Sequence, residues 1–313
     1  MPARSRPERR WSVAAMAMTG LLATALLGWA AIALTKDTAI GKAALEQVKQ
    51  IVAFGPRPPA SEAHRKEEQA IVEKLRAAGV MVEQDRFSAD TPIGPVAMNN
   101  IVGRIAGRGT GSAGGRTIIL ATHYDTKLER NFAFVGANDG GSGTGLLLAL
   151  APQLVKRNYN HSVWLVFLDG EEAFENWTAR DSVYGSRRFA VQLKASGNVS
   201  QIGAFILLDM IGDADLGILR DSNSTPWLAD VVWKAASKLG YSHNFLNSGG
   251  AIEDDHIPLI QAGVPSLDLI DFDYGRGNAY WHTAEDTLDK LSAQSLQIVG
   301  EVVLETLAEL DRK

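Results

Sequence analysis

The middle of the chain contains two short stretches in which almost every residue is apolar. Residues 162–168 read Ser-Val-Trp-Leu-Val-Phe-Leu, and residues 203–208 read Gly-Ala-Phe-Ile-Leu-Leu. Short apolar runs without interruption are typical of β-strands that are buried on both faces. Such strands occur in parallel or mixed sheets whose two faces are covered by helices. This feature therefore favours an α/β fold.

The rest of the chain supplies the other strands and the helices that such a sheet needs. Two more strands are predicted at residues 117–121 and 265–270, and Ser61 can cap the start of a helix. Apolar residues at helical spacing predict helices over residues 38–54, 61–78, 143–154, 182–193, 226–239 and 292–308. We predict a single globular α/β domain over residues 37–313, with a central, mostly parallel mixed sheet flanked by helices.

The N-terminal region has the pattern of a membrane segment. Four arginines within the first ten residues precede an apolar run over residues 11–34. About 20 apolar residues in a helix cross the hydrocarbon core, whereas the core of a cleaved signal peptide is about 7–15 residues long. We predict that residues 1–36 form a basic segment and an N-terminal transmembrane helix, which anchors the domain on the periplasmic or extracellular face. A signal peptide cleaved near residues 31–33 and a buried helix are the alternatives.

Composition limits the kinds of site that the chain can build. The chain has 36 acidic and 31 basic residues, and no basic cluster lies beyond the first ten residues, which argues against nucleic acid as a partner. The chain has no cysteine, which excludes disulfides and thiolate metal sites. A metal ion must therefore be held by His, Asp and Glu.

Polar clusters follow the predicted strands, where ligands bind in open α/β sheets. The clusters are His123-Tyr124-Asp125, the glycine-rich turn at residues 136–143 with Asp139, Asp169-Gly170-Glu171-Glu172, Asp209, Asp254-Asp255-His256 and Trp281-His282-Thr283. A single cluster of this kind is more often a solvated loop than a site. Many carboxylates gathered at one edge of a sheet, however, need a cation to neutralise them. Together the clusters predict a metal site.

The residue types indicate which metal this site would bind. Oxygen and imidazole ligands without sulfur suit zinc, and cobalt or manganese could replace it. Catalytic zinc sites use three protein ligands and leave one position open for water or substrate. Asp139, Glu172 and His282 make such a set, and Glu171 would then be free to act as acid and base.

These clusters also carry a family resemblance over roughly residues 40 to 312. The chain resembles the glutaminyl cyclases (glutaminyl-peptide cyclotransferases) of the animal secretory type, which belong to the zinc aminopeptidase superfamily. The motifs are residues 123–127 (His-Tyr-Asp-Thr-Lys), 170–174 (Gly-Glu-Glu-Ala-Phe), Trp177, 181–187 (Asp-Ser-Val-Tyr-Gly-Ser-Arg), 208–212 (Leu-Asp-Met-Ile-Gly), 254–258 (Asp-Asp-His-Ile-Pro) and 281–283 (Trp-His-Thr). The resemblance implies an aminopeptidase-like fold with one zinc ion per chain, held by Asp139, Glu172 and His282.

The resemblance also implies a reaction. Peptides or proteins with an N-terminal glutamine would be cyclised to pyroglutamate with release of ammonia, and Glu171 would be the proton shuttle. Asp209 and Asp254 would complete an acidic hydrogen-bond network. Trp177 and Trp281 would line the substrate pocket.

The sequence departs from the animal pattern at three places. Thr122 stands where a cysteine of a disulfide is expected, and residues 271–280 form a longer segment before Trp281. The turn at residues 136–143 is more similar to that of an aminopeptidase than to that of an animal cyclase. This turn leaves the number of metal ions open.

Two other functions stay open at this point. In a two-zinc aminopeptidase, His123, Asp139 and Asp209 would hold one metal, the trio named above would hold the other, and Glu171 would activate a water molecule. The two pocket tryptophans and Asp254 favour the cyclase. A catalytically silent peptide-binding domain of the same fold is the third possibility, and the intact Glu171 argues against it.

Overall fold

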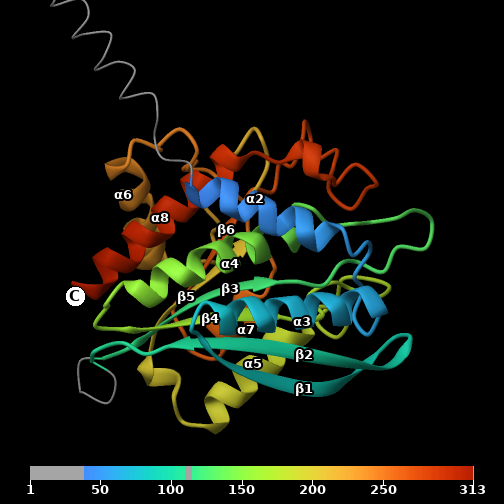
Figure 1. Cartoon of the computed structure of the whole chain (residues 1–313), viewed down its shortest axis with the longest axis horizontal. Helices are drawn as coiled ribbons and strands as arrows, with labels where there is room; N and C mark the ends of the chain where they lie inside the picture. The colour runs from blue at the N-terminus through green and yellow to red at the C-terminus, as the bar shows by residue number, and fades with distance from the viewer. Residues whose placement is uncertain (1–38, 110–114, 313) are drawn as a thin grey trace, which may run out of the picture. The chain divides into compact units, whose positions relative to one another are not determined.

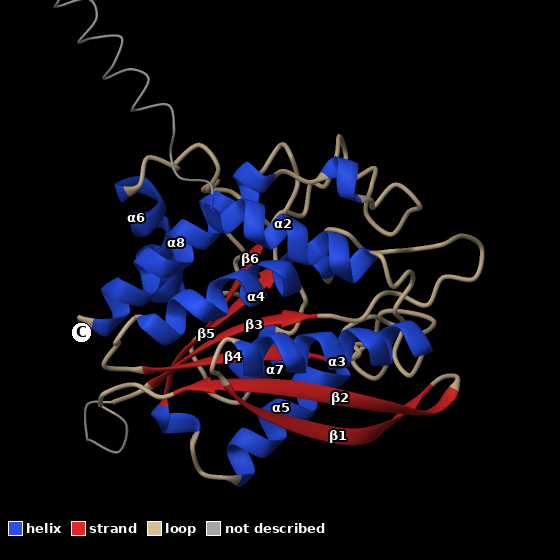
Figure 2. Cartoon of the chain, in the orientation of Figure 1, coloured by secondary structure: helices blue, strands red, loops and turns tan. Residues whose placement is uncertain are grey.

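The strands lie in one sheet with helices packed against both faces (Figure 1 and Figure 2). The computed structural model describes residues 39–109 and 115–312, and within these ranges the sheet has six strands in the order β1-β2-β4-β3-β5-β6. The strands are β1 (Met81–Thr91), β2 (Gly94–Ile105), β3 (Thr117–His123), β4 (Ser162–Leu168), β5 (Ile202–Asp209) and β6 (Ser266–Ile270).

The sheet is mixed, as predicted. β4, β3, β5 and β6 run parallel to one another, whereas β2 pairs antiparallel with β4 and with β1. All four strands predicted from the sequence are confirmed. The β1–β2 hairpin was not predicted, because β1 is an edge strand in which only Ala89 is buried. An edge strand of this kind lacks the apolar pattern that identifies a buried strand.

The predicted helices are also present, with ends that shift by a few residues. They are α2 (Ala39–Val52), α3 (Glu62–Ala77), α4 (Gly141–Lys156), α5 (Tyr184–Ala195), α6 (Pro226–Lys238) and α8 (Ala293–Asp311). Ser61 caps α3 as expected, since its hydroxyl accepts a hydrogen bond from the backbone N–H of His64 at 3.1 Å. The short helix α7 (His256–Gln261) was missed, because six residues are too few to show a helical period.

Alternating side chains of the central strands enter two separate cores. On β3, Ile118 and Leu120 pack into a large core with residues of α2, α3, α4, α6 and α8. Ile119 and Ala121 face the opposite way and pack with residues of α5 and α7. Because both faces of the central strands are covered, both sets of alternating positions must be apolar. This double burial explains the uninterrupted apolar runs in the sequence.

The parallel strands bring the polar clusters to one edge of the sheet. β3 ends at His123, β4 at Leu168, β5 at Asp209 and β6 at Ile270. Since these strands are neighbours and run in the same direction, the loops that follow them are also neighbours. The sheet therefore gathers residues that are far apart in the sequence.

The predicted membrane anchor at residues 11–34 lies outside the described residues. Within residues 39–109 and 115–312, no helix combines the length and the apolar character that a membrane span requires. The boundary between residues 1–36 and 37–313 stays a prediction.

Truncation of a side chain in the core should lower stability strongly. Leu207 on β5 is fully buried, so Leu207→Ala removes apolar contacts and leaves a cavity. We expect a loss of about 2–5 kcal/mol in the free energy of unfolding, measured by urea denaturation. The control is Val191→Ala on α5, where the side chain is 66% exposed and the change should be within about 0.5 kcal/mol. Equal losses in the two variants would contradict the assigned core.

Candidate active site

Asp139, Glu172 and His282 meet at the carboxyl edge of the sheet. His282 Nε2 lies 3.0 Å from Glu172 Oε1 and 3.3 Å from Asp139 Oδ2. Asp139 precedes α4, Glu172 follows β4, and His282 lies in the loop between β6 and α8. The ligand atoms of the three residues lie within 4.8 Å of one another. The structure thus brings together the three residues that the sequence analysis selected as metal ligands.

The turn that carries Asp139 is fixed by two residues that the sequence analysis did not select. Asp286 accepts hydrogen bonds from the backbone N–H of Asn138 at 2.8 Å and from that of Asp139 at 3.2 Å. The fully buried Arg57 donates to the carbonyl oxygen of Gly136 at 3.2 Å. Gly136 has φ of +50°, a conformation that glycine adopts without strain. Both helpers act on backbone atoms, so their residue types gave no sign of the role.

His282 is held in an unusual backbone conformation. Its φ is +52°, which is costly for a residue with a side chain. The ring stacks on Trp281 with 4.1 Å between ring centroids and meets Phe134 edge-on at 5.8 Å. These aromatic contacts help to fix the ring with Nε2 toward the carboxylates of Asp139 and Glu172.

A second histidine group adjoins the first and shares Asp139 with it. His123 Nε2 lies 3.2 Å from Asp139 Oδ1 and 3.2 Å from Asp209 Oδ1. The two oxygens of Asp139 therefore face two different histidines, His123 and His282. Burial opposes ionisation of Asp139, but these two histidines hold the pKa of its carboxyl group below the ordinary value. Both ligand groups of the two-metal alternative are present.

Glu171 lies beside the ligand residues and is almost fully buried. Burial raises the pKa of Glu171 well above its ordinary value, and Asp254 and Glu172 raise it further against the opposing effect of His123. A carboxyl group with a raised pKa can both accept and donate a proton near neutral pH. Asp125 holds the turn that carries Glu171 and Glu172 and is not one of the candidate ligands. Its carboxylate accepts hydrogen bonds from the backbone N–H groups of Glu171 at 3.1 Å and of Glu172 at 3.3 Å.

Asp209 and Asp254 are both buried at this edge. The hydrogen-bond network that we expected between them is absent, because the two carboxyl groups are not hydrogen-bonded to each other. Asp209 Oδ1 is paired with His123 at 3.2 Å. Asp254 accepts from the backbone N–H of Asp255 through Oδ1, and its Oδ2 has no hydrogen-bond partner in the described part of the chain. Burial raises the pKa of Asp254 well above its ordinary value, and Asp209 raises it further. Asp209 therefore affects Asp254 through charge repulsion and not through a hydrogen bond.

A cavity of about 300 Å³ opens above these groups. Trp177 and Trp281 line it, as the sequence analysis expects, and Phe272 and Ile252 add to its apolar wall. Trp177 is 40% exposed, so this part of the wall is open to solvent. The polar residues in the lining are Lys127, Asp139, Glu171, Glu172, Asp209, Glu253, Asp254 and His282. The cavity therefore has an acidic floor and apolar sides, to which three aromatic and three aliphatic residues contribute.

The residues of this site fit a zinc ion. The donors are carboxylate oxygens and imidazole nitrogens, which zinc accepts, and their atoms already converge. The buried carboxyl groups of Asp139, Glu171, Glu172, Asp209 and Asp254 outnumber the nearby cationic groups. Burying carboxylates without compensation is costly, so a divalent cation here would stabilise the fold as well as serve chemistry.

The sequence pattern of peptidase family M28 matches residues 100–307, a stretch that contains both ligand groups and Glu171. The chain belongs to peptidase family M28. The crystal structure of the glutaminyl cyclase of an Acidobacteriales bacterium superposes on this chain with a TM-score of 0.82 and 44% sequence identity. The match covers 88% of this chain and 95% of the chain in that structure.

Two further comparisons show the range of this family. A glutaminyl-peptide cyclotransferase-like protein of Bos taurus is 32% identical over an alignment of 262 residues, and the match covers 74% of this chain and 66% of that relative's length. A Zn-dependent exopeptidase from Parabacteroides distasonis ATCC 8503 is 27% identical, with a TM-score of 0.76, covering 85% of this chain and 97% of its own. The predicted resemblance to the glutaminyl cyclases is confirmed, and with it the prediction that the chain is an enzyme of this group.

Zinc binding by this M28 member should become tighter as the pH rises. Without a cation, burial lowers the pKa of His282, but Glu172 and Asp139 outweigh burial and raise it to about 10. Below that pH the ring holds a proton that a metal ion must displace, because only neutral imidazole offers a lone pair. The apparent affinity should rise about tenfold per pH unit for each proton displaced. Competition with a chromogenic chelator at several pH values measures this slope.

The slope has a matched control. His282→Ala lacks the proton that zinc displaces at this residue, so its weaker zinc binding should depend less steeply on pH. Identical slopes in the two proteins would show that His282 is not a ligand.

Proposed function

We propose that the chain converts an N-terminal glutamine of peptides or proteins to pyroglutamate with release of ammonia. The observation that carries the proposal is a single cavity that combines the Asp139, Glu172 and His282 group with the buried Glu171 and the two tryptophans. The similar proteins named glutaminyl cyclase and glutaminyl-peptide cyclotransferase support it.

The cavity suits a peptide N-terminus. Its acidic floor favours an amine, and its aromatic sides at Trp177 and Trp281 favour the apolar part of a glutamine side chain. Cyclisation consumes no water, so apolar side chains beside the reacting groups reduce competing hydrolysis. The buried Oδ2 of Asp254, which lacks a partner among the described residues, is available to accept a hydrogen bond from a substrate N–H group.

Asp139, Glu172 and His282 would hold one zinc ion, which supplies Lewis-acid polarisation of the side-chain amide carbonyl when it is bound. The nitrogen of the substrate's α-amine then forms a bond to the carbonyl carbon of that amide, Cδ of the glutamine, and the bond from Cδ to the amide nitrogen breaks. Glu171 accepts the proton that the amine loses and delivers it to the departing ammonia. Its raised pKa suits both transfers.

Asp209 and Asp254 support Glu171 in this proposal. Both are buried within the acidic floor, and repulsion from Asp254 contributes to the raised pKa of Glu171. We assign them to the proton transfer and not to the metal. His123, which pairs with Asp209, then serves to balance charge and is not a ligand.

The second candidate is a two-zinc aminopeptidase. The complete group of His123, Asp139 and Asp209 supports it, and so does the similarity to a protein named a Zn-dependent exopeptidase. Here Asp139 would bridge two ions and Glu171 would activate water. The metal count and the products separate the two candidates.

The location is a further part of the proposal. The arginines and the apolar run at residues 11–34 support an anchor that holds the domain on the periplasmic or extracellular face. Fractionation of cells that express the chain checks this. Recovery of the whole chain from the cytoplasmic soluble fraction would contradict it.

Glu171→Gln should slow cyclisation strongly without loss of zinc. The amide has a similar shape but cannot shuttle the proton, so we expect kcat to fall about 10²–10⁴-fold. The purified full-length chain is incubated with a peptide that begins with glutamine, and mass spectrometry follows the loss of one ammonia. Metal analysis of the same samples should give one zinc per chain.

The control is Glu175→Gln, because Glu175 lies in the same loop with an exposed side chain. Its activity should equal that of the wild type. Release of free N-terminal amino acids by a chain with two bound metals would reject the cyclase in favour of the peptidase. Full activity in Glu171→Gln would reject both assignments of Glu171.

A further inference from the structure

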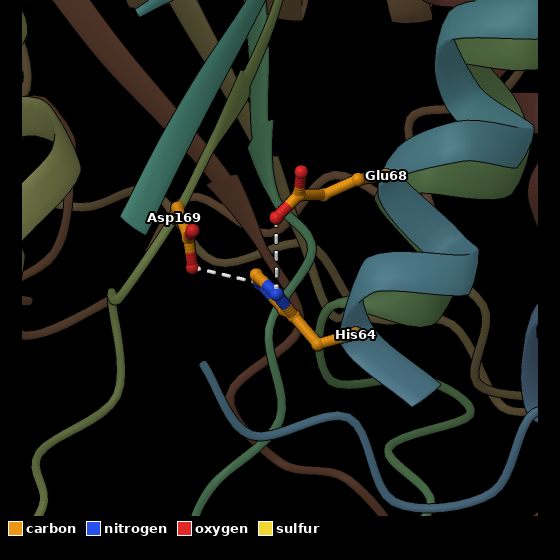
Figure 3. A group of neighbouring side chains, drawn as sticks. All are labelled: His64, Glu68 and Asp169. Carbon is orange, nitrogen blue, oxygen red and sulfur yellow. Dashed lines mark hydrogen bonds and ion pairs between the residues drawn. The ribbon is translucent and has the colours of Figure 1, made fainter. Parts of the chain in front are cut away.

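Helix α3 carries a buried histidine that faces two carboxylates behind the candidate active site. His64 is fully buried, and its Nε2 lies 2.9 Å from Asp169 Oδ1 while its Nδ1 lies 3.3 Å from Glu68 Oε1. Figure 3 shows Glu68, one turn further along α3, and Asp169, the first residue after β4, approaching the ring from different sides.

This arrangement suits a protonated imidazole and does not suit a metal ion. A metal bound by His64 would need one ring nitrogen and both carboxylates on the same side of the ring. Here each nitrogen has its own carboxylate: Nε2 is hydrogen-bonded to Asp169, and Nδ1 lies at ion-pair distance from Glu68 without a hydrogen bond to it. A protonated ring carries the positive charge that both carboxylates favour. Burial lowers the pKa of His64, but Asp169 and Glu68 outweigh burial and raise it to about 10.

The carboxylate of Asp169 is held from several directions. Its Oδ1 faces His64, and its Oδ2 accepts a hydrogen bond from the backbone N–H of Asn99 on β2 at 2.6 Å. The hydroxyl of Tyr124 lies 3.1 Å from the same Oδ2, and the ring of Tyr124 stacks on His64 with 4.9 Å between centroids. Asp169 is therefore a junction between α3, β2 and the residues that follow β3.

The turn that starts at Asp169 carries two central residues of the candidate site. Gly170 follows with φ of +69°, and Glu171 and Glu172 come next. On the far side of the turn, Asp125 accepts the backbone N–H groups of Glu171 and Glu172. The turn is thus clamped at both ends, by Asp169 and by Asp125. Adjacent buried carboxylates repel each other, so their positions depend on such clamps.

We propose that His64 is a positioning residue, which fixes Asp169 and thereby sets the orientation of Glu171 and Glu172 for metal binding and proton transfer. The inference rests on the proposed zinc site. Nothing else in the mechanism uses His64, although its fully buried ring faces two carboxylates. Preorganisation of the ligand turn gives this buried group a function.

His64→Gln tests this role, because glutamine retains polarity but cannot face both carboxylates as a cation. We expect a loss of zinc affinity of about 10–100-fold, the usual effect of removing a group that orients a metal ligand. Affinity is measured in the full-length chain by competition with a chromogenic chelator, at a temperature where denaturation curves show the variant to be folded. We also expect kcat to fall more than KM changes, since the clamp acts on Glu171.

The matched control is Gln297→Leu. Gln297 is buried and accepts a hydrogen bond from the backbone N–H of Gly41 at 2.8 Å, which ties α8 to α2. Its loss should lower the denaturation midpoint and leave the zinc affinity unchanged. If His64→Gln likewise changes only the midpoint, His64 is merely structural and the proposal is wrong.

A double-mutant cycle tests whether His64 acts on zinc binding through Asp169. Asp169→Asn should weaken zinc binding about as much as His64→Gln, and the double variant should lose little more than either single one. Losses that multiply would show that His64 does not act through Asp169. If His64→Gln does not fold, Glu68→Gln takes its place, because this variant keeps the bond between His64 and Asp169 but removes the second carboxylate. We expect its zinc affinity to fall by less than that of a His64 variant. An unchanged zinc affinity in Glu68→Gln would overturn the proposal.

The outcomes also separate this inference from the proposed function. A wild-type chain that binds zinc but does not release ammonia contradicts only the cyclase. A wild-type chain that binds zinc with the same affinity as His64→Gln contradicts only the role of His64. A second bound metal that is lost in His64→Gln would make this cluster a metal site and overturn the inference.

Discussion

The carboxyl edge of the parallel strands buries more carboxyl groups than a low-dielectric environment tolerates without compensation. Asp139, Glu172 and Asp209 are all within a few ångströms of a histidine nitrogen, and Glu171 and Asp254 lie in the same cavity. Repulsion among such groups must be offset by cations, by hydrogen bonds or by protonation. Much of the structure around the site can be understood as meeting this requirement.

The compensation is arranged in layers around the carboxylates. Closest are the rings of His123 and His282, in which each Nε2 atom lies within 3.3 Å of two carboxylates. Behind them, carboxylates that are not ligands accept backbone N–H groups: Asp125 and Asp286 each fix a turn that carries a candidate ligand. Further out, His64 holds Asp169. Each layer restricts the next one inward, so the candidate ligands lie close to their positions before any ion binds.

Several parts of this design were predictable from the sequence, and others were not. Residues 162–168 form β4 with the predicted bounds, because burial on both faces leaves an uninterrupted apolar pattern. The β1–β2 hairpin escaped prediction because its outer strand is mostly exposed. In the site, the ligands could be selected because metal-binding residue types followed predicted strands. Arg57, Asp286 and His64 could not, because a buried charged residue looks like a surface residue in a sequence.

The sequence by itself determined the fold class, the two-sided covering of the sheet and the kind of ligand available, since it contains histidines and carboxylates but no cysteine. Only the tertiary structure decided which of these residues meet. His282 reaches Glu172 across 110 positions of the chain, and Asp139 is shared between two histidines. Contacts of this range depend on the order and direction of the strands, which bring distant loops to one edge, and local sequence patterns do not encode that order.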